Sequence, residues 1–267
     1  MFSLSEAIDL KMKSENTLST LDRAVDIFLL LEQEGREMGV TEIAKALGVN
    51  KSTIYRSLAT LESRDFLQQN TETGKYWLGL KLYSLGMLIS EKMMLKGVAL
   101  PYVKALSQKL NEASHLAVLD RTAVEYPKQI IIDKVETQHL LSLTPPVGSS
   151  APCHSSGVGK CLLAFTAEKY VQKFIGNPLP RFTKKTITDW DALKLQLEQI
   201  RQDGFAADDE ELEEGLSCVA APILNKERQV VAAISISGPT SRLRTERFDE
   251  IVSEVKKTAR AISIALH

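Results

Sequence analysis

The first part of the fold is decided by the stretch TEIAKALGVNKSTIYRSLATLESRDFL, residues 41–67. Apolar side chains recur at helical spacing on both sides of Gly48-Val49-Asn50, a tripeptide typical of a tight turn. Thr41 is a candidate N-cap for the helix before this turn, and Asn50 for the helix after it, which we expect to run to about Arg64. The stretch therefore predicts two helices joined by a turn.

The residues on either side of this stretch extend the pattern. Upstream, apolar positions at helical spacing predict a helix from Leu18 to about Glu34. Downstream, the extended segments Phe66–Asn70 and Lys75–Leu78 flank a candidate hairpin turn at residues 71–74. Three helices followed by a hairpin are the order of a winged helix-turn-helix. We assign it to residues 17–80, and we expect residues 1–16, which lack periodicity, to form a disordered tail.

The rest of the chain alternates between helical and extended patterns. Residues 81–100 predict a linker helix, and Pro101 is expected at the first turn of the next helix. From His115 onward, strands are interleaved with helices and end in a hairpin, which predicts an α+β sensor domain over residues 101–267 rather than a doubly wound parallel sheet. The expected strands are residues 115–120, 129–135, 140–144, 218–224 and 230–237.

The charge of the chain cancels overall but not locally. Its 267 residues include 33 Lys and Arg against 34 Asp and Glu, so no bulk positive charge is present to hold phosphate. Residues 1–44 carry four basic and nine acidic side chains, whereas residues 45–81 carry six basic and three acidic ones. This asymmetry is typical of a local nucleic-acid contact surface, although a solvated surface produces it as well.

The cysteines and the apolar runs indicate a cytoplasmic protein. Three cysteines scattered along the chain indicate reduced thiols rather than a disulfide framework. Acidic residues interrupt the only apolar stretch near the N-terminus, so we expect no signal peptide. Apolar runs such as Ile27–Leu31 are far shorter than the ~18–20 residues that cross a bilayer.

The helix after the turn presents a polar face suited to DNA. If Ile54, Leu58 and Leu61 point inward, the opposite face carries small hydroxyl side chains and one arginine, Arg56. Such a face can enter the major groove closely, with Arg56 donating to guanine and the lysines contacting phosphate. An ordinary solvated helix surface is the alternative. The candidate DNA-binding residues are Lys51, Ser52, Thr53, Tyr55, Arg56 and Lys75.

The loop Cys153-His154-Ser155-Ser156-Gly157-Val158-Gly159-Lys160 has several possible functions. It lacks a glycine and a hydroxyl side chain that a phosphate-binding loop requires. Cys153 and His154 could form a catalytic pair, but no orienting carboxylate is evident. A metal site with Cys218 is conceivable, but the paired spacing is missing. We favour a helix N-terminus lined by small residues, whose free N–H groups and dipole suit a carboxylate.

The strand at residues 230–237 could form a wall of the same site. Alternation places Val231, Ala233, Ser235 and Ser237 on a small, semi-polar face and the larger residues on a core face. Such a face suits a ligand pocket, although small residues also permit close packing. The acidic run Asp208–Glu214 is expected to be mostly a solvated loop in which Asp208 alone turns inward.

Four blocks of sequence resemble the IclR family of bacterial transcriptional regulators. They are the stretch at residues 41–67 with KYWLGLKLYSLG after it, then HSSGVGKCLLAF, DDEELEEGLSCVAAPI and VVAAISISGP. The resemblance implies a winged helix-turn-helix joined by a linker helix to a GAF-like effector domain with an antiparallel sheet. It also implies a dimer on operator DNA. The implied effector-binding residues are Gly157, Val158, Asp208, Leu216, Cys218, Ser235 and Ser237, with Leu140 and Ala151 matching more loosely.

Together these patterns predict a ligand-responsive transcriptional regulator, with repression the expected mode. We expect a homodimer or a dimer of dimers on double-stranded operator DNA, a small organic acid as effector, and neither metal nor cofactor. The alternatives are an enzyme with an appended DNA-binding domain, acting on a small carboxylate, and a GAF-type module that acts only through protein partners. No ordered nucleophile and base are found in the sequence, so we expect no catalytic residues.

Overall fold

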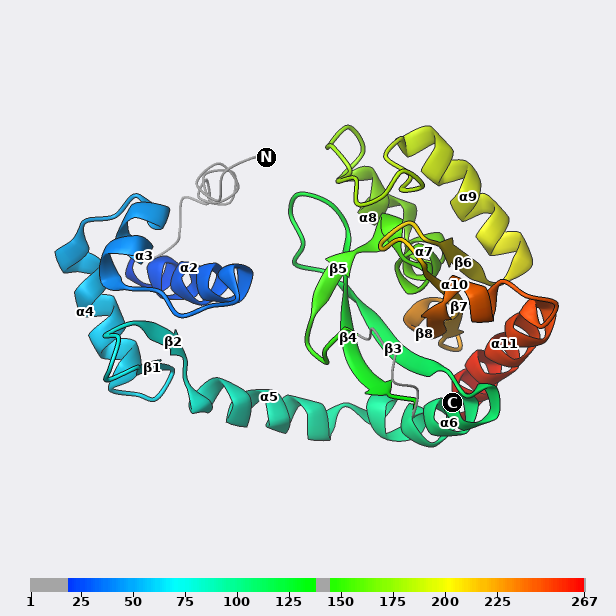
Figure 1. The fold of residues 1–267 in the computed structure, drawn as a ribbon, viewed down its shortest axis with the longest axis horizontal. Coiled ribbons are helices and arrows are strands. Elements are labelled where there is room, and N and C mark those ends of the chain that lie inside the picture. Colours follow the sequence, from blue (N-terminus) through cyan, green and yellow to red (C-terminus); the bar gives the residue numbers. More distant parts are fainter. Residues whose placement is uncertain (1–18, 138–144, 267) are drawn as a thin grey trace. The chain divides into compact units, whose positions relative to one another are not determined.

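A computed structural model of the chain describes residues 19–137 and 145–266 (Figure 1). The expected tail at residues 1–16, the expected strand at residues 140–144, and Leu140 lie outside the described residues. The described residues form two compact units that divide between Met93 and Met94. Each unit has its own hydrophobic core.

The first unit is a helix-turn-helix followed by a hairpin, as the sequence predicted. Helix α2 packs with α3 and α4, and the strands β1 and β2 pair in an antiparallel hairpin. The inward residues of these elements, Ile27, Ile43, Ile54 and Leu58, are fully buried in one core. The elements span Ser19–Glu34 (α2), Val40–Leu47 (α3), Lys51–Glu62 (α4), Leu67–Gln69 (β1) and Tyr76–Leu78 (β2).

The caps of the two central helices differ from the prediction. Gly39, not Thr41, is the N-cap of α3, because the Glu42 carboxylate reaches back and accepts from the Gly39 N–H at 2.7 Å. A side chain from the third helical position thus pairs with the N–H of the cap residue, which is the Glu half of a capping box. Asn50 is the N-cap of α4, but its side chain makes no capping bond. A further bridge, in which Met38 pairs with Tyr76, was not anticipated from the sequence.

The helical stretch after the hairpin is divided differently from the prediction. Helix α5 spans Leu80–Lys92, and α6 spans Met94–Leu110, so Pro101 lies inside α6 rather than in its first turn. Proline lacks the N–H that would pair with the carbonyl of Gly97. Gly97 is exposed, so water can satisfy that carbonyl. Buried residues on the other face, including Ala99 and Val103, pack the helix against the second unit's core and favour its continuity.

The second unit is built on a six-stranded antiparallel sheet of order β5-β4-β3-β8-β7-β6, which confirms the predicted α+β class. Strands β5 and β6 were not anticipated, because both are short. The strands span Ala113–Asp120 (β3), Lys128–Val135 (β4), Ser150–Pro152 (β5), Ala206–Asp209 (β6), Leu216–Leu224 (β7) and Val230–Pro239 (β8). The helices span Cys153–Ser155 (η1, a 3-10 turn), Gly157–Ala164 (α7), Glu168–Gln172 (α8), Trp190–Asp203 (α9), Thr240–Leu243 (α10) and Phe248–Ala265 (α11).

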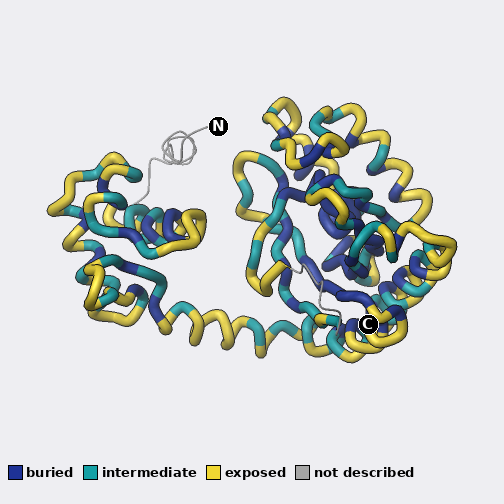
Figure 2. The backbone as a smooth tube through the Cα atoms, in the orientation of Figure 1, coloured by how far each residue is buried: buried dark blue, intermediate teal, exposed yellow. Residues whose placement is uncertain are grey.

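Helices cover both faces of this sheet, as Figure 2 shows by the buried strands between exposed helical surfaces. Helices α6 and α11 pack on one face, over Leu116, Val219 and Ile234. Helix α7, backed by α9, packs on the other face over Ala117 and Ala220. We call this second side the α7 face. None of the described helices combines the length and apolarity needed to cross a membrane.

Strand β8 departs from strict alternation near its start. The register between β7 and β8 shifts so that Ile223 pairs with Ala232 and Leu224 pairs with Val230, which leaves Val231 as an extra residue. Because of this β-bulge, Val230 and Val231 lie on the opposite faces of the sheet from those predicted. Val231 packs against the core under α6 and α11, and Val230 joins the core on the α7 face. Beyond the bulge, Ala233, Ser235 and Ser237 lie on the α7 face as predicted.

Candidate nucleic-acid interface and ligand site

Helix α4 presents the predicted polar surface. Ile54 and Leu58 are fully buried, and the helix turns Ser52, Tyr55 and Arg56 outward. Lys51 is also exposed, and Thr53 is half-buried. The structure therefore brings five of the six candidate DNA-binding residues onto one helix and its first turn.

The side chains of this surface fall into two groups. The hydroxyls of Ser57, Thr60 and Ser63 donate to carbonyl groups of their own helix, at 3.3, 2.9 and 2.8 Å. By contrast, neither Lys51 nor Arg56 forms an ion pair with any residue that the structure describes. The two cations are therefore available for an external anion.

Lys75 lies at the tip of the hairpin, directly before β2, where its carbonyl accepts from the Asn70 N–H at 2.8 Å. Its ammonium is 3.9 Å from the Glu42 carboxylate, which also accepts from Arg36 Nη1 at 2.9 Å. The Gly39 N–H and the Arg36 guanidinium lower the pKa of Glu42. Lys75 is thus already partly balanced by a carboxylate, so its expected contact with phosphate is less favourable than that of Lys51.

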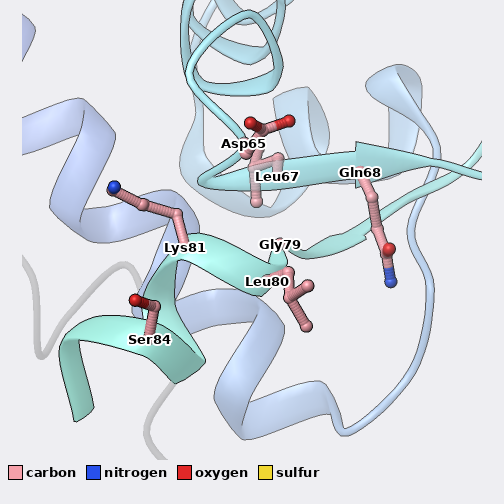
Figure 3. A pocket seen from close by; sticks show the side chains of 7 residues that line it. All are labelled: Asp65, Leu67, Gln68, Gly79, Leu80, Lys81 and Ser84. Carbon is pink, nitrogen blue, oxygen red and sulfur yellow. The ribbon is translucent and has the colours of Figure 1, made fainter. Parts of the chain in front are cut away.

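A cavity of about 390 Å³ lies between the hairpin and the start of α5 (Figure 3). The Gly79 N–H donates to the Phe66 carbonyl at 2.8 Å, and the Lys81 N–H donates to the Asp65 carbonyl at 3.1 Å. A Cβ at Gly79 would lie 2.2 Å from the Asp65 carbonyl oxygen, so only glycine allows this approach. The hairpin and α5 are thereby held together. The cavity is lined by Asp65, Leu67, Gln68, Gly79, Leu80, Lys81 and Ser84, and by none of the predicted effector residues.

In the second unit, the start of α7 presses directly on the sheet. A Cβ at Gly157 would lie 2.6 Å from Cys218 Sγ and 3.4 Å from Ala220 Cβ. Ser156 caps the helix, since its hydroxyl accepts from the Gly159 N–H at 3.1 Å and donates to Gln129 Oε1 at 2.9 Å. The helix start is therefore fixed against β7 and β4 at once.

Strand pairing brings the predicted effector residues into two neighbouring rows on the α7 face. In one row Asp208 pairs with Cys218, and Cys218 with Ser237. In the next row Ala220 pairs with Ser235, and Ser235 with a histidine that the sequence did not single out, His115. Because Gly157 rests on Cys218 and Ala220, the helix start and the two serines border the same region.

The four remaining predicted positions differ in where they lie. Leu216 precedes Cys218 by two residues on β7 and is half-buried, so it extends the same face. Val158 is buried in the core under α7. Ala151 lies on β5, at the opposite edge of the sheet from β6, and Leu140 is outside the described residues. The face itself is covered rather than open, since Ser235 is only 2% exposed.

A buried ionic cluster lies beneath α7, and the sequence did not predict it. Lys160 is fully buried and donates to the Glu211 carboxylate and, at 3.1 Å, to the Ala207 carbonyl. Glu211 therefore turns inward together with Asp208, whereas Asp208 alone was expected to do so. Burial is the main cause that raises the pKa of Asp208 to about 7, and nearby Lys160 opposes the rise. Near neutral pH a substantial fraction of the Asp208 side chains carry a proton.

His115 is a further residue that sequence reasoning missed. Its ring is 2% exposed, and its Nδ1 lies 3.4 Å from Ser237 Oγ. Burial, with a smaller contribution from Lys134, lowers its pKa to about 4, so the imidazole is neutral near pH 7. Alternation along β3 could have indicated it, because His115 and the core residue Ala117 are two residues apart.

The catalytic and metal-binding alternatives find little support in this geometry. Burial raises the pKa of the thiol of Cys153 well above its usual value, and that of Cys218 to about 12, so neither is a ready thiolate. His154 Nε2 is hydrogen-bonded to the Pro180 carbonyl at 2.9 Å. Within the described ranges, no three His, Cys, Asp or Glu side chains gather as metal ligands would.

Comparison with known protein families matches both units. The family model described as the IclR helix-turn-helix domain matches residues 20–71, and the bacterial transcriptional regulator IclR C-terminal model matches residues 87–264. The HTH-type transcriptional regulator KdgR of Escherichia coli K12 is 34% identical over 252 residues, covering 94% of each chain. The transcriptional repressor IclR of the same strain is 33% identical over 249 residues, covering 93% of this chain and 90% of the relative.

Solved structures show the same architecture. An IclR transcriptional regulator from Alicyclobacillus acidocaldarius matches with a TM-score of 0.81 and 26% identity, covering 94% of this chain and all of that one. An IclR homolog from Microbacterium hydrocarbonoxydans, solved with 4-hydroxybenzoate, matches with a TM-score of 0.78 and 25% identity, covering 93% and 99%. The chain therefore belongs to the IclR family of bacterial transcriptional regulators, with a DNA-binding helix-turn-helix domain and an effector-binding domain.

Proposed function

We propose that this chain is a cytoplasmic repressor whose affinity for operator DNA is changed by a small organic acid. The observation that carries the ligand part is the contact of Gly157 with Cys218 and Ala220. This contact places the start of α7 beside two serines and a carboxyl group. Relatives named as repressors support the direction of regulation, and the homolog solved with 4-hydroxybenzoate supports the ligand class.

The start of α7 supplies the group that suits a carboxylate. The first N–H groups of a helix have no carbonyl partner within that helix, and the helix dipole places partial positive charge there. The Gly159 N–H is taken by Ser156 and the Gly157 N–H is directed at the Cys218 thiol, which leaves the Val158 amide without a carbonyl of α7. The absence of a side chain lets Gly157 lie against β7 and lets Gly159 lie against the Cys153 backbone. A carboxylate is therefore the natural ligand of this helix end.

Asp208 would repel a carboxylate if it were ionised. Its raised pKa, about 7, removes much of that obstacle, because a protonated Asp208 donates a hydrogen bond to the ligand instead. The acid and Asp208 then share one proton. On this basis effector binding takes up a proton and weakens as the pH rises above about 7.

Exposed apolar side chains in the first unit support a homodimer, or a dimer of dimers. Helix α5 has no buried residue, as its tube without dark blue shows (Figure 2). Its apolar side chains Leu80, Tyr83 and Ile89 expose 76%, 66% and 65% of their surfaces. Helix α2 adds a stripe of Leu21, Val25 and Leu29 at helical spacing. Clusters of exposed apolar side chains mark interaction surfaces. Dimerisation through them would present two α4 helices to successive half-sites, ~34 Å apart.

DNA binding in the presence and absence of acids tests the proposal. A fluorescent duplex from upstream of the gene for this chain is titrated with the protein, and small organic acids are added in turn. We expect at least one acid to change the dissociation constant by ~5–150-fold, the usual range of allosteric coupling. Ser235→Ala/Ser237→Ala should bind DNA normally and respond more weakly to that acid.

Several outcomes would contradict the proposal. DNA affinity that does not change with salt concentration would contradict specific binding to an operator. It would favour a module that acts through protein partners. DNA binding that no acid alters would remove the ligand class. Consumption of the added acid by the protein would revive the enzyme alternative. Sedimentation of an Ile89→Glu variant as the same oligomer as the wild type would remove α5 from the dimer interface.

A further inference from the structure

His115 carries a buried polar atom without a partner. The ring is 2% exposed, and its Nε2 has no hydrogen-bond partner among the described residues. The other nitrogen, Nδ1, lies 3.4 Å from Ser237 Oγ. Buried polar atoms in native proteins are nearly always hydrogen-bonded, so this nitrogen requires an explanation. A ligand that forms a hydrogen bond with Nε2 would explain it.

The position of His115 places it on the α7 face. On β3 it pairs with Ser235 of β8, and Ala117, two residues along, lies in the core on the α7 face. Side chains two residues apart on a strand share a face. His115 therefore borders both proposed effector serines, two strands away from Cys218. Neighbouring strands are ~4.8 Å apart, so His115 and the residues under Gly157 lie about 10 Å apart across the sheet.

The other buried histidine shows what a structural imidazole looks like here. His154 also has one unpartnered nitrogen, Nδ1, but its Nε2 is hydrogen-bonded to the Pro180 carbonyl at 2.9 Å. Its ring also lies between the rings of Tyr126 and Phe182, at 6.4 and 6.3 Å between centroids. His154 thus ties a loop to η1. His115 has no comparable anchor, since the only hydrogen bond of its ring to a described residue is the long one to Ser237.

The charge state of His115 selects the kind of group it can bind. Burial lowers its pKa to about 4, and the positive charge of Lys134, its pairing partner on β4, adds to this effect. The neutral imidazole has one donor and one acceptor. Such a group suits a hydroxyl or carbonyl oxygen, whereas the helix start on the other side suits the carboxylate.

We propose that His115 is an effector-binding residue that hydrogen-bonds a hydroxyl or carbonyl oxygen of an acid whose carboxylate lies at the start of α7. This inference rests on the proposed function, because it assumes that the acid binds on the α7 face. It narrows the effector to acids that carry a second, uncharged oxygen. An acid without that oxygen leaves Nε2 unpaired and binds more weakly.

The first test needs no ligand. Thermal unfolding is followed for the full chain carrying His115→Leu, His115→Gln or the control His154→Leu. A binding residue with an unpaired nitrogen contributes little to folding, so His115→Leu should melt within about 2 °C of the wild type, or higher. His154→Leu loses the bond to Pro180 and should melt several degrees lower.

The second test uses matched acids that differ only in one uncharged oxygen. These probes are propionate with lactate and pyruvate, and benzoate with 4-hydroxybenzoate. Isothermal titration should show that the wild type binds an oxygen-bearing member about tenfold or more tightly than its partner acid. His115→Leu should bring the ratio of the two dissociation constants close to one, mainly by weakening the binding of the oxygen-bearing acid. His115→Gln, which keeps a donor and an acceptor, should retain part of the ratio.

The outcomes separate the two proposals. If His115→Leu melts as far below the wild type as His154→Leu and leaves the ratio unchanged, His115 is a structural residue and this inference is wrong. If no acid of the panel binds or alters DNA affinity, the ligand class of the proposed function fails. In that case the ligand-free comparison alone decides whether His115 supports the fold.

Discussion

The two candidate surfaces of this protein place their functional side chains in opposite environments. On α4, Lys51, Ser52 and Arg56 are exposed, and the two cations form no ion pair within the described residues. On the α7 face, Asp208 and Ser235 are 3% and 2% exposed and lie among other buried groups. The α4 surface contacts solvent and is accessible to a macromolecular partner. The second is built into the core.

This difference has an energetic consequence. A side chain that contacts only solvent can be replaced with little effect on folding, so its loss is seen in binding alone. A polar side chain in the core is coupled to the packing and charges around it, so its loss affects folding and ligand binding together. Predictions that separate stability from binding therefore test the comparison. The two tryptophans, Trp77 in the first unit and Trp190 in the second, allow each unit to be followed separately.

The largest effect is expected at the buried ion pair. Lys160→Met leaves the Glu211 carboxylate buried without its cation, which costs about 3–5 kcal/mol of unfolding free energy. Urea unfolding, monitored by Trp190 in a Trp77→Phe background, should show this loss. The Trp77 signal in a Trp190→Phe background should not change.

Two further variants sharpen this result. Lys160→Met/Glu211→Leu removes both charges and should recover a large part of the lost stability. Lys185→Met breaks an exposed ion pair to Asp209 of 3.2 Å and should have no measurable effect. Equal losses for Lys160→Met and Lys185→Met would contradict the view that burial makes the difference.

The next effect is a pH dependence of the second unit. The unfolded chain ionises aspartate near pH 3.9, whereas Asp208 in the folded protein keeps its proton up to about pH 7. The folded state therefore holds an extra proton over this interval, and stability falls by up to about 1.4 kcal/mol per pH unit between about pH 4 and 7. Above about pH 7 this contribution stays constant.

Asp208→Asn should remove this slope, as measured by the Trp190 unfolding midpoint from pH 4 to 8. Its neighbour Asp209 is the matched control, because its side chain is half-exposed and pairs with Lys185. Asp209→Asn should keep the wild-type slope. If Asp208→Asn also keeps it, another group titrates over this range.

A third effect follows from the close approach of α7. Gly157→Ala places a methyl group 2.6 Å from Cys218 Sγ, so the helix start must move, at a cost of about 1–3 kcal/mol. Effector binding should weaken at the same time, since the amides of this turn shift. Gly157→Ala/Cys218→Ala gives the methyl group room and should recover most of the stability. A double variant no more stable than the single one would mean that other contacts oppose the methyl group.

The smallest effect on the fold is expected at the exposed surface. Arg56→Ala should weaken DNA binding about tenfold or more, by loss of a base contact, while both tryptophan signals report wild-type stability. Lys51→Ala should weaken binding to all sequences and reduce the slope of log affinity against log salt by about one. Unchanged DNA affinity of Arg56→Ala in anisotropy measurements would contradict the assignment of α4 as the helix that contacts the bases.

Much of the fold could be predicted because its signals are local. The turn at Gly48, the buried faces of α2 and α4 and the strands β4, β7 and β8 depend on spacing within a few residues. Asp208 was expected to turn inward, and it does. The short strands β5 and β6 were missed because three or four residues carry too little alternation.

Other errors arose where distant packing overrode a local preference. Pro101 disfavours a helix interior, yet α6 continues through it because Ala99 and Val103 pack into the core under α6 and α11. The error at Thr41 is of another kind, because the Glu42 carboxylate that accepts from the Gly39 N–H is only three residues away in the sequence. Val231 was assigned to the wrong face because a bulge depends on the register of two strands, which the sequence of one strand does not contain.

The sequence by itself determined the class of the protein, the order of its elements and the exposed polar face of α4. These features follow from residue spacing along one segment and from family resemblance. Only the tertiary structure joined Lys160 to Glu211, 51 residues apart, and placed His115 beside Ser237, 122 residues apart. The reason is physical: a buried charge or imidazole is defined by the groups that surround it, and strand pairing brings those groups from distant parts of the chain.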